Sequence, residues 1–190
     1  GAFVRQYEKN SAARTINPGT YRFKRQMSAA DALAVMLDPM NRVESTITVL
    51  AGERMSVIKR RIVDVLDVSS ADVDKAFADT AAIGLPAEAG GSAEGWLHRG
   101  EYKVEEGDTP TAVIARMVKA TIDELNALGV PAADRETVLI KASIVEGEMG
   151  SNPKYMPKVA RVIENRLVDD KDTHGVLGMD STTLYGAGKE

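Results

Sequence analysis

Residues 101–118 read Glu-Tyr-Lys-Val-Glu-Glu-Gly-Asp-Thr-Pro-Thr-Ala-Val-Ile-Ala-Arg-Met-Val, and this stretch decides the fold class. Polar and apolar residues alternate over 101–104, as in a half-buried strand. Thr109 and Pro110 suit the N-cap and the first position of a helix. The apolar residues that follow have the spacing of one helix face: Val113, Ile114, Met117 and Val118. A short strand joined by a Gly-Asp turn to a capped amphipathic helix is therefore predicted.

The same pattern occurs upstream, between residues 46 and 65. A strand is predicted over 46–49, followed by a turn at Gly52 and by Ser56 as the candidate N-cap of a helix. The apolar face of that helix consists of Ile58, Ile62 and Val65. A second strand–helix copy is expected here.

A first copy begins at residue 20, with a strand over 20–23, Ser28 as N-cap and a helix through 32–37. Three strand–helix copies predict an α+β fold. The second and third copies resemble a LysM module, a small sugar-binding unit, and the likeness is strongest over 102–109. Any strand joined to a capped helix gives this pattern. Glycan binding and a plain scaffold therefore both stay open for these copies.

The rest of the chain is predicted to be mostly helical. Helices are expected over 69–85, from Asp134 as N-cap to about Met149, and over 157–168. A small, Gly-rich loop is expected over 86–92, and the stretch 171–190, rich in Gly, Ser and Thr, is expected to be loop-like.

Composition excludes several classes of protein. The 190 residues are 44% hydrophobic and 27% charged, which suits one large or two small folded domains. The net charge of −4 argues against a nucleic-acid partner, and the absence of cysteine excludes disulfides and thiolate chemistry. His98 and His174 lie far apart, and no phosphate-binding loop is present, so neither a metal nor a cofactor is expected. No membrane-spanning stretch is found.

The helix over 138–149 carries the residues that suggest chemistry. It is apolar on two sides, which predicts that it is buried, yet it ends in Glu146 and Glu148. Residues two apart on a helix point in nearly opposite directions, so the two carboxylates are expected to have different roles. Glu148 continues the apolar stripe of Ile140 and Ile144, and desolvation there would suit a general acid. A helix end that simply reaches solvent is the alternative.

Several motifs in order resemble the YceG/MltG-like endolytic murein transglycosylases. Residues 142–148, Ala-Ser-Ile-Val-Glu-Gly-Glu, are similar to that family's A-S-I-V-E-x-E signature. Residues 158–167 resemble its K-V-A-x-V-x-x-N-R-L helix, and residues 180–186 resemble D-[PS]-T-x-x-Y-G. Upstream, Gly19-Thr20-Tyr21 and Glu94-Gly95-Trp96-Leu97 stand at the expected places. The likeness covers nearly the whole chain.

The resemblance implies that Glu148 is the catalytic residue, acting on peptidoglycan glycan strands. Glu148 would protonate the β-1,4 bond between MurNAc and GlcNAc, and the MurNAc 6-hydroxyl would then attack C1 to leave a 1,6-anhydroMurNAc end. Trp96 is expected to be a packing anchor. Asn165 and Arg166 are expected either to orient the sugar or to tie their helix to the following loop. The candidate substrate-binding residues are Glu94, Glu146, Asn165, Arg166, Asp180, Ser181, Thr182 and Tyr185.

The resemblance also implies a domain plan. We expect a strand–helix unit with a truncated start over 1–45, a LysM-like module over 46–92, and a mostly helical catalytic domain over 93–190. The catalytic domain is expected to be incomplete at its C-terminus, so that a chain ending here has poor activity.

The parent protein is expected to be anchored in the cytoplasmic membrane by an upstream helix, with its catalytic part extracytoplasmic. Cell-wall synthases and proteins of the divisome or elongasome are candidate partners. Two alternatives are a non-catalytic peptidoglycan-binding scaffold and a protein-interaction domain of a cell-wall assembly complex.

Overall fold

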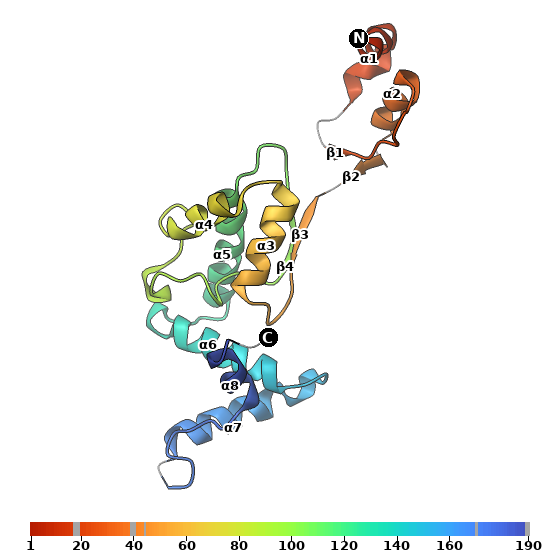
Figure 1. Cartoon of the computed structure of the whole chain (residues 1–190). Coiled ribbons are helices and arrows are strands. Elements are labelled where there is room, and N and C mark those ends of the chain that lie inside the picture. The colour runs from red at the N-terminus through yellow and green to blue at the C-terminus, as the bar shows by residue number, and fades with distance from the viewer. Residues whose placement is uncertain (17–19, 39–40, 44, 170, 189–190) are drawn as a thin grey trace.

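The computed structural model describes residues 1–16, 20–38, 41–43, 45–169 and 171–188. The described part is mostly helical, with two small antiparallel sheets, and this confirms the predicted α+β class. The elements form three groups that follow one another along an elongated molecule (Figure 1).

The N-terminal group comprises helix α1 (Ala2–Lys9), a 3₁₀ turn (Ser11–Thr15), strand β1 (Thr20–Tyr21), helix α2 (Ala29–Leu37) and strand β2 (Arg42–Val43). β1 pairs antiparallel with β2. Ser28 caps α2 as predicted, because its hydroxyl accepts a hydrogen bond from the Asp31 N–H at 3.1 Å. The strand predicted over 20–23 ends at Tyr21, since the charged residues that follow stay exposed. Gly19 lies outside the described residues.

The central group contains strands β3 (Thr46–Val49) and β4 (Gly100–Lys103) and helices α3 (Met55–Leu66), α4 (Ser70–Ala78) and α5 (Pro110–Ala127). β3 has the predicted bounds, and β4 begins and ends one residue earlier than predicted. The strands of the second and third copies pair antiparallel, with Ile47 opposite Tyr102. The pairing links a strand of the predicted 46–92 module with a strand of the predicted 93–190 domain. The division into domains stays a prediction.

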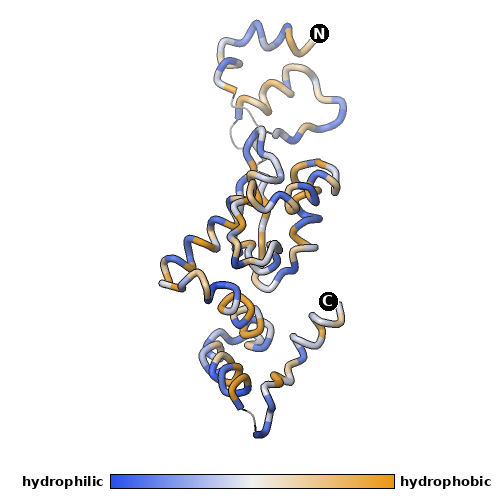
Figure 2. Tube along the Cα trace, turned by 90° about the vertical axis from the view of Figure 1, so that its left-hand side faces the viewer, coloured by the Kyte–Doolittle hydropathy of each residue, from blue (hydrophilic) through white to orange (hydrophobic). Residues whose placement is uncertain are grey.

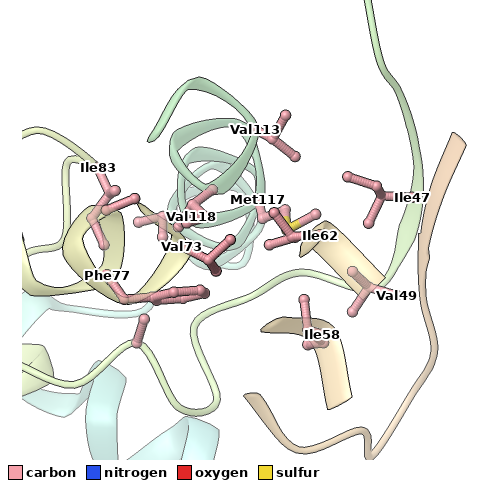
Figure 3. Packing of buried hydrophobic residues seen from close by; sticks show 13 residues of the cluster. Ile47, Val49, Ile58, Ile62, Val73, Phe77, Ile83, Val113, Met117 and Val118 are labelled. Carbon is pink, nitrogen blue, oxygen red and sulfur yellow. The ribbon is translucent and has the colours of Figure 1, made fainter. Parts of the chain in front are cut away.

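A hydrophobic core of buried residues from β3, α3, α4 and α5 holds the central group together (Figure 3). β3 points Ile47 and Val49 toward α3, and α5 contributes the same apolar face that its spacing predicts. α4 ends at Ala78 and not near residue 85, because the next residues form turns. The largest fully buried side chains of this core are Ile47, Ile58, Ile62, Ile83, Ile114, Met117, Val73, Val113 and Val118.

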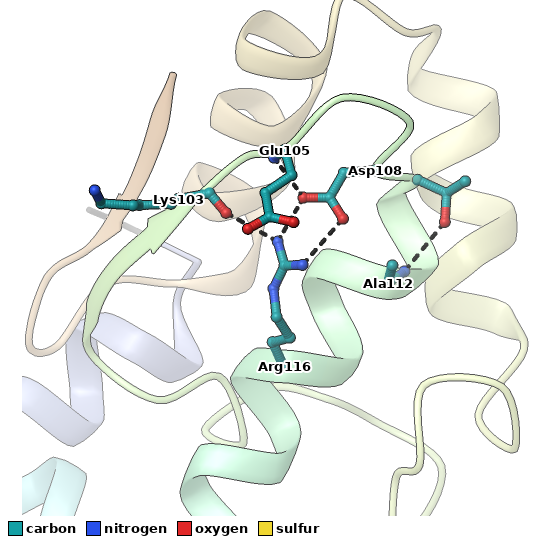
Figure 4. Close-up of polar contacts among 6 residues, drawn as sticks. Lys103, Glu105, Asp108, Ala112 and Arg116 are labelled. Carbon is teal, nitrogen blue, oxygen red and sulfur yellow. Dashed lines mark hydrogen bonds and ion pairs between the residues drawn. The ribbon is translucent and has the colours of Figure 1, made fainter. Parts of the chain in front are cut away.

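The turn between β4 and α5 is held by polar contacts (Figure 4). Asp108 accepts a hydrogen bond from the Glu105 N–H at 2.9 Å and forms an ion pair of 2.7 Å with Arg116. The hydroxyl of Thr109 accepts from the Ala112 N–H at 3.2 Å, so the predicted cap is confirmed. The Gly-Asp-Thr turn thus stabilises the start of α5.

The predicted cap of α3 was wrong. The helix begins at Met55, so Ser56 lies inside its first turn, and Arg54 occupies the N-cap position. The free Met55 N–H donates instead to both carboxylate oxygens of Glu94, at 3.2 and 3.3 Å. A carboxylate at a helix N-terminus satisfies an unpaired N–H and also interacts well with the helix dipole. Glu94 therefore caps the N-terminus of α3, the role that was predicted for Ser56.

The C-terminal group comprises α6 (Arg135–Glu148), α7 (Met156–Val168) and α8 (Asp180–Gly186), with 3₁₀ turns at Ala132–Asp134 and Pro153–Tyr155. Asp134 stands at the predicted N-cap position without a capping side-chain hydrogen bond. The expectation of a loop over 171–190 was wrong for 180–186, which form α8. Their Ser-, Thr- and Gly-rich sequence favours helix weakly, and contact with α6 supports the helix instead.

The predicted burial of α6 was also wrong. No residue of α6 is buried, and Ile140 exposes 51% of its surface. α6 packs against α7 and α8, while Val138 and Leu139 touch a small cluster around Trp96, Ala89 and Leu125. The described elements cover only part of its circumference, so apolar residues on the remaining side stay accessible. No described helix has the length and apolar character needed to cross a membrane.

Candidate functional site

Glu148 is the last residue of α6, and its carboxylate meets the first turn of α8. Its side chain is half-buried, and its Oε1 accepts a hydrogen bond from the backbone N–H of Ser181 at 3.1 Å. The two residues are 33 positions apart in the chain. The fold therefore brings together the A-S-I-V-E-x-E segment and the D-S-T segment, which the sequence shows only as separate motifs.

Gly147 allows this close approach of the two helices. A Cβ at position 147 would lie 3.0 Å from the Cβ of Ser181, which is tighter than side chains normally tolerate. The hydroxyl oxygen of Ser181 is buried in the same contact and has no hydrogen-bond partner among the described residues. A small residue between the two glutamates thus lets α8 lie directly against α6.

Glu146 points toward a different element. Its Oε2 would lie 3.6 Å from a Cβ at Gly52, in the turn that joins β3 to α3. Gly52 has a φ of +71°, a conformation that glycine adopts without strain. The two carboxylates therefore face separate partners, as the helical spacing predicts. Glu146 and Arg166 form no ion pair within the described part of the chain.

The same turn also contacts α8. The Arg54 guanidinium lies over the ring of Tyr185, 4.8 Å from its centroid, and Tyr185 exposes 56% of its surface. Glu94 holds the start of α3 at Met55, next to Arg54. We call this region the junction, because it joins the central group to α6 and α8. The junction consists of Gly52, Arg54, Glu94, Glu146, Gly147, Glu148, Ser181 and Tyr185.

Arg166 and Asn165 lie outside these contacts. Arg166 donates to the carbonyl of Leu177, and its own carbonyl accepts from the hydroxyl of Thr173 at 2.8 Å. Arg166 thus ties α7 to the loop that leads into α8, which agrees with the structural alternative for this residue. Asn165 is exposed on α7.

Asp180 and Thr182 lie on either side of Ser181 in the first turn of α8. Asp180 is exposed, and the Thr182 hydroxyl donates to the Met179 carbonyl at 2.7 Å. Thr182 therefore supports the start of the helix that presents Ser181 to Glu148. Within the described ranges, no three His, Cys, Asp or Glu side chains are grouped as a metal site would require.

The predicted role of Trp96 as a packing anchor is confirmed. Its side chain is fully buried, and its indole N–H donates to Glu136 Oε2 at 2.7 Å. Because Glu136 is in the first turn of α6, this bond attaches the helix that carries Glu148 to the central group. Trp96 therefore anchors the N-terminal end of α6, opposite the end that carries Glu148.

Three junction residues were missed by sequence reasoning. Gly147 has a detectable signal, since a glycine inside a helix usually has a packing reason. Gly52 was expected only as a turn, and nothing in the sequence links it to Glu146. Arg54 carries no local signal, because its contact with Tyr185 spans 131 positions of chain.

The fold and junction define a strand–helix module joined to a helical region that presents a glutamate at a helix end. The chain belongs to the YceG-like family, whose model matches residues 1–190. A crystal structure of a YceG-like protein from Listeria monocytogenes has 20% sequence identity and a TM-score of 0.65. The match covers 99% of this chain and 66% of that one, and it shows the shared fold. No curated protein matches this chain in sequence.

Proposed function

We propose that this chain belongs to a lytic transglycosylase that cleaves the β-1,4 bond between MurNAc and GlcNAc in peptidoglycan. One observation carries the proposal: the carboxylate of Glu148 meets the Ser181 N–H, so two family motifs converge on one acidic group. Membership of the YceG-like family supports the same reaction class. Glu148 is half-buried, so it has access both to solvent and to a bound glycan.

The chemistry needs one carboxyl group. Glu148 donates its proton to the glycosidic oxygen, and the bond from that oxygen to C1 of MurNAc breaks. The resulting carboxylate accepts the proton of the MurNAc 6-hydroxyl as its oxygen bonds to C1, which closes the 1,6-anhydro ring. An intramolecular nucleophile has a high effective concentration, so no water and no second carboxylate are needed. The Ser181 N–H would stabilise the carboxylate while it carries charge.

Exposed residues in and beside the junction would bind the glycan. Tyr185 is exposed and lies under Arg54, so its other face is a candidate sugar platform. Asp180 is exposed beside Ser181 and is a candidate hydrogen-bond partner for sugar hydroxyls. Glu94 binds the Met55 N–H just after the β3–α3 turn, and Glu146 lies beside Gly52 of that turn. The substrate implies an extracytoplasmic location and partners among the cell-wall synthases.

The test is mass spectrometry of peptidoglycan incubated with the 190-residue chain and, in parallel, with the longest form of the protein that expresses. Glu148→Gln keeps the shape of the side chain and removes its acid. It is expected to lower the yield of anhydro-ended fragments by about 10²–10⁴-fold, the usual contribution of a general acid–base. Glu164→Gln is the matched control, because Glu164 lies on neighbouring α7 in an exposed ion pair with Lys141.

The products separate the alternatives. Anhydro ends that disappear in Glu148→Gln and persist in Glu164→Gln support both the reaction and the residue. Reducing ends would indicate hydrolysis and contradict the mechanism. Glycan that binds without any cleavage by either form would favour the non-catalytic scaffold.

A further inference from the structure

The N-terminal segment is strongly basic in an otherwise acidic chain. Six of the 24 Lys and Arg residues lie in residues 1–25, with one of the 28 acidic residues, so this segment carries a formal charge of +5. The remaining 165 residues carry −9. When residues 26–45, with three acidic residues and one arginine, are included, residues 1–45 still carry +3 and the rest −7. This separation of charge points to an anionic partner at the N-terminal end.

The densest part is the exposed tetrapeptide Arg22-Phe23-Lys24-Arg25, which we call the basic loop. All four residues are exposed, and Phe23 exposes 47% of its surface. Across the described ranges, Arg22, Lys24 and Arg25 have no ion pair or side-chain hydrogen bond. The basic loop therefore presents an accessible aromatic ring flanked by three accessible cations.

Helix α1 also exposes cations beside apolar side chains. Arg5 and Lys9 are exposed, and so are the apolar Val4 (51%) and Tyr7 (41%). No residue of α1 is buried, although the helix packs against α2. Figure 2 shows hydrophilic and hydrophobic stretches alternating through this part of the chain. Cations and accessible apolar side chains thus occur together in both elements.

The basic loop and α1 lie apart from the junction. Among the described elements, α1 and α2 pack mainly against each other and the adjoining 3₁₀ turn. Figure 1 shows this group at one end of the molecule, with the central group between it and α6–α8. A ligand of the N-terminal group would therefore bind at a site separate from Glu148.

We propose that the basic loop and α1 dock on a membrane surface that contains anionic lipid headgroups. Lys and Arg side chains near such a surface attract the headgroup phosphates, while an aromatic ring between them can enter the boundary of the acyl chains. A purely electrostatic partner would explain the cations and leave Phe23, Val4 and Tyr7 unexplained. This contact would be additional to any upstream membrane anchor.

The test is sedimentation of the 190-residue chain with vesicles of phosphatidylcholine alone or mixed with phosphatidylglycerol. The chain is expected to bind the mixed vesicles, and added salt should weaken binding because it screens charge. The triple variant Arg22→Ser, Lys24→Ser, Arg25→Ser should lose about a hundredfold in affinity, given about fivefold for each cation. Phe23→Ser alone should lose roughly tenfold.

The matched control is the triple variant Arg60→Ser, Lys75→Ser, Arg99→Ser, which removes the same charge from exposed positions of the central group. Its binding should fall much less than that of the basic-loop variant. Equal binding by both triple variants, or equal binding to both kinds of vesicle, would overturn the proposal. The proposal would also be overturned if dextran sulfate displaced the chain fully from the vesicles while Phe23→Ser left vesicle binding unchanged. That result would indicate a surface that binds polyanions in general.

Discussion

The central group and the C-terminal group are both helix-rich, yet their interiors differ greatly. The central group has a continuous core of thirteen buried residues around Ile47, Ile62 and Met117. From residue 135 onward, only Ile163 and Met179 are buried among the described residues. The central group is thus a rigid scaffold, and the C-terminal group depends on contacts with it.

The difference explains where the candidate chemistry lies. Local stability follows buried apolar contacts, and functional residues are often carried on less stable segments placed against a rigid frame. Glu148 and Ser181 belong to the weakly packed group, while Gly52, Arg54 and Glu94 belong to the rigid one. The junction is therefore the place where the scaffold restricts the helix that carries Glu148.

The largest expected effect tests this difference in packing. Ile62→Ala removes a side chain with 0% exposure and should lower the free energy of unfolding by about 2–5 kcal/mol. Ile140→Ala, at a position with 51% exposure, should change it by about 0.5 kcal/mol or less. Urea denaturation followed by circular dichroism measures both. Similar losses in the two variants would mean that the groups do not differ in packing.

A second effect comes from the ion pair of Glu53 and Arg61 inside the scaffold. The Arg61 guanidinium donates to both Glu53 oxygens at 2.7 Å and lowers the Glu53 pKa from 4.5 to about 2. Because the folded-state pKa is depressed, this stabilisation is present above pH 4.5 and is lost as the pH falls toward 2. The loss should be roughly 2 kcal/mol, allowing for solvent screening.

Urea denaturation at a series of pH values between neutral and acidic measures this loss. Arg61→Met should remove most of the Glu53 contribution to the acid dependence and leave the part due to the Leu50 N–H. Arg60→Met, at the exposed neighbouring position, should leave the whole contribution in place. Asp108 adds to the trend in the same direction, because Arg116 lowers its pKa. An unchanged acid dependence in Arg61→Met would contradict the assignment.

A third, smaller effect tests how the scaffold holds α6. Trp96→Phe keeps most of the buried ring and removes the N–H that donates to Glu136. The expected loss is about 1–2 kcal/mol, since the bond involves a charged acceptor. The substitution should increase the rate of amide hydrogen exchange more in the first turns of α6 than in α3. Equal acceleration in both helices would show that the change is global and that Trp96 does not specifically attach α6.

The smallest effect concerns the contact of Arg54 with Tyr185. A double-mutant cycle with Arg54→Ala and Tyr185→Leu isolates this pair from the other interactions of Arg54. The coupling free energy should be about 0.5–1 kcal/mol, as for cation–π contacts at accessible positions. A coupling of zero would mean that the β3–α3 turn and α8 are merely adjacent.

Local patterns predicted the parts of this fold that depend on neighbouring residues. β3, the caps at Ser28 and Thr109, and the start of α5 follow from alternation and capping chemistry, which act over a few positions. The ordered motifs also identified the family and singled out Glu148. These features require no knowledge of what lies across the molecule.

Only the tertiary structure decided the features that join distant segments. Glu94 caps the start of α3 from 39 positions away. α8 forms against α6 although its sequence favours helix only weakly. The strands of the second and third copies pair into one sheet. The exposure of α6 likewise depends on how much of its surface other elements cover. The sequence by itself determined β3, the caps at Ser28 and Thr109 and the choice of Glu148 as the candidate acid, because short-range propensities and side-chain chemistry suffice for these. The placement of Glu148 against Ser181 had to come from the fold, since a hydrogen bond across 33 residues depends on packing that no local pattern encodes.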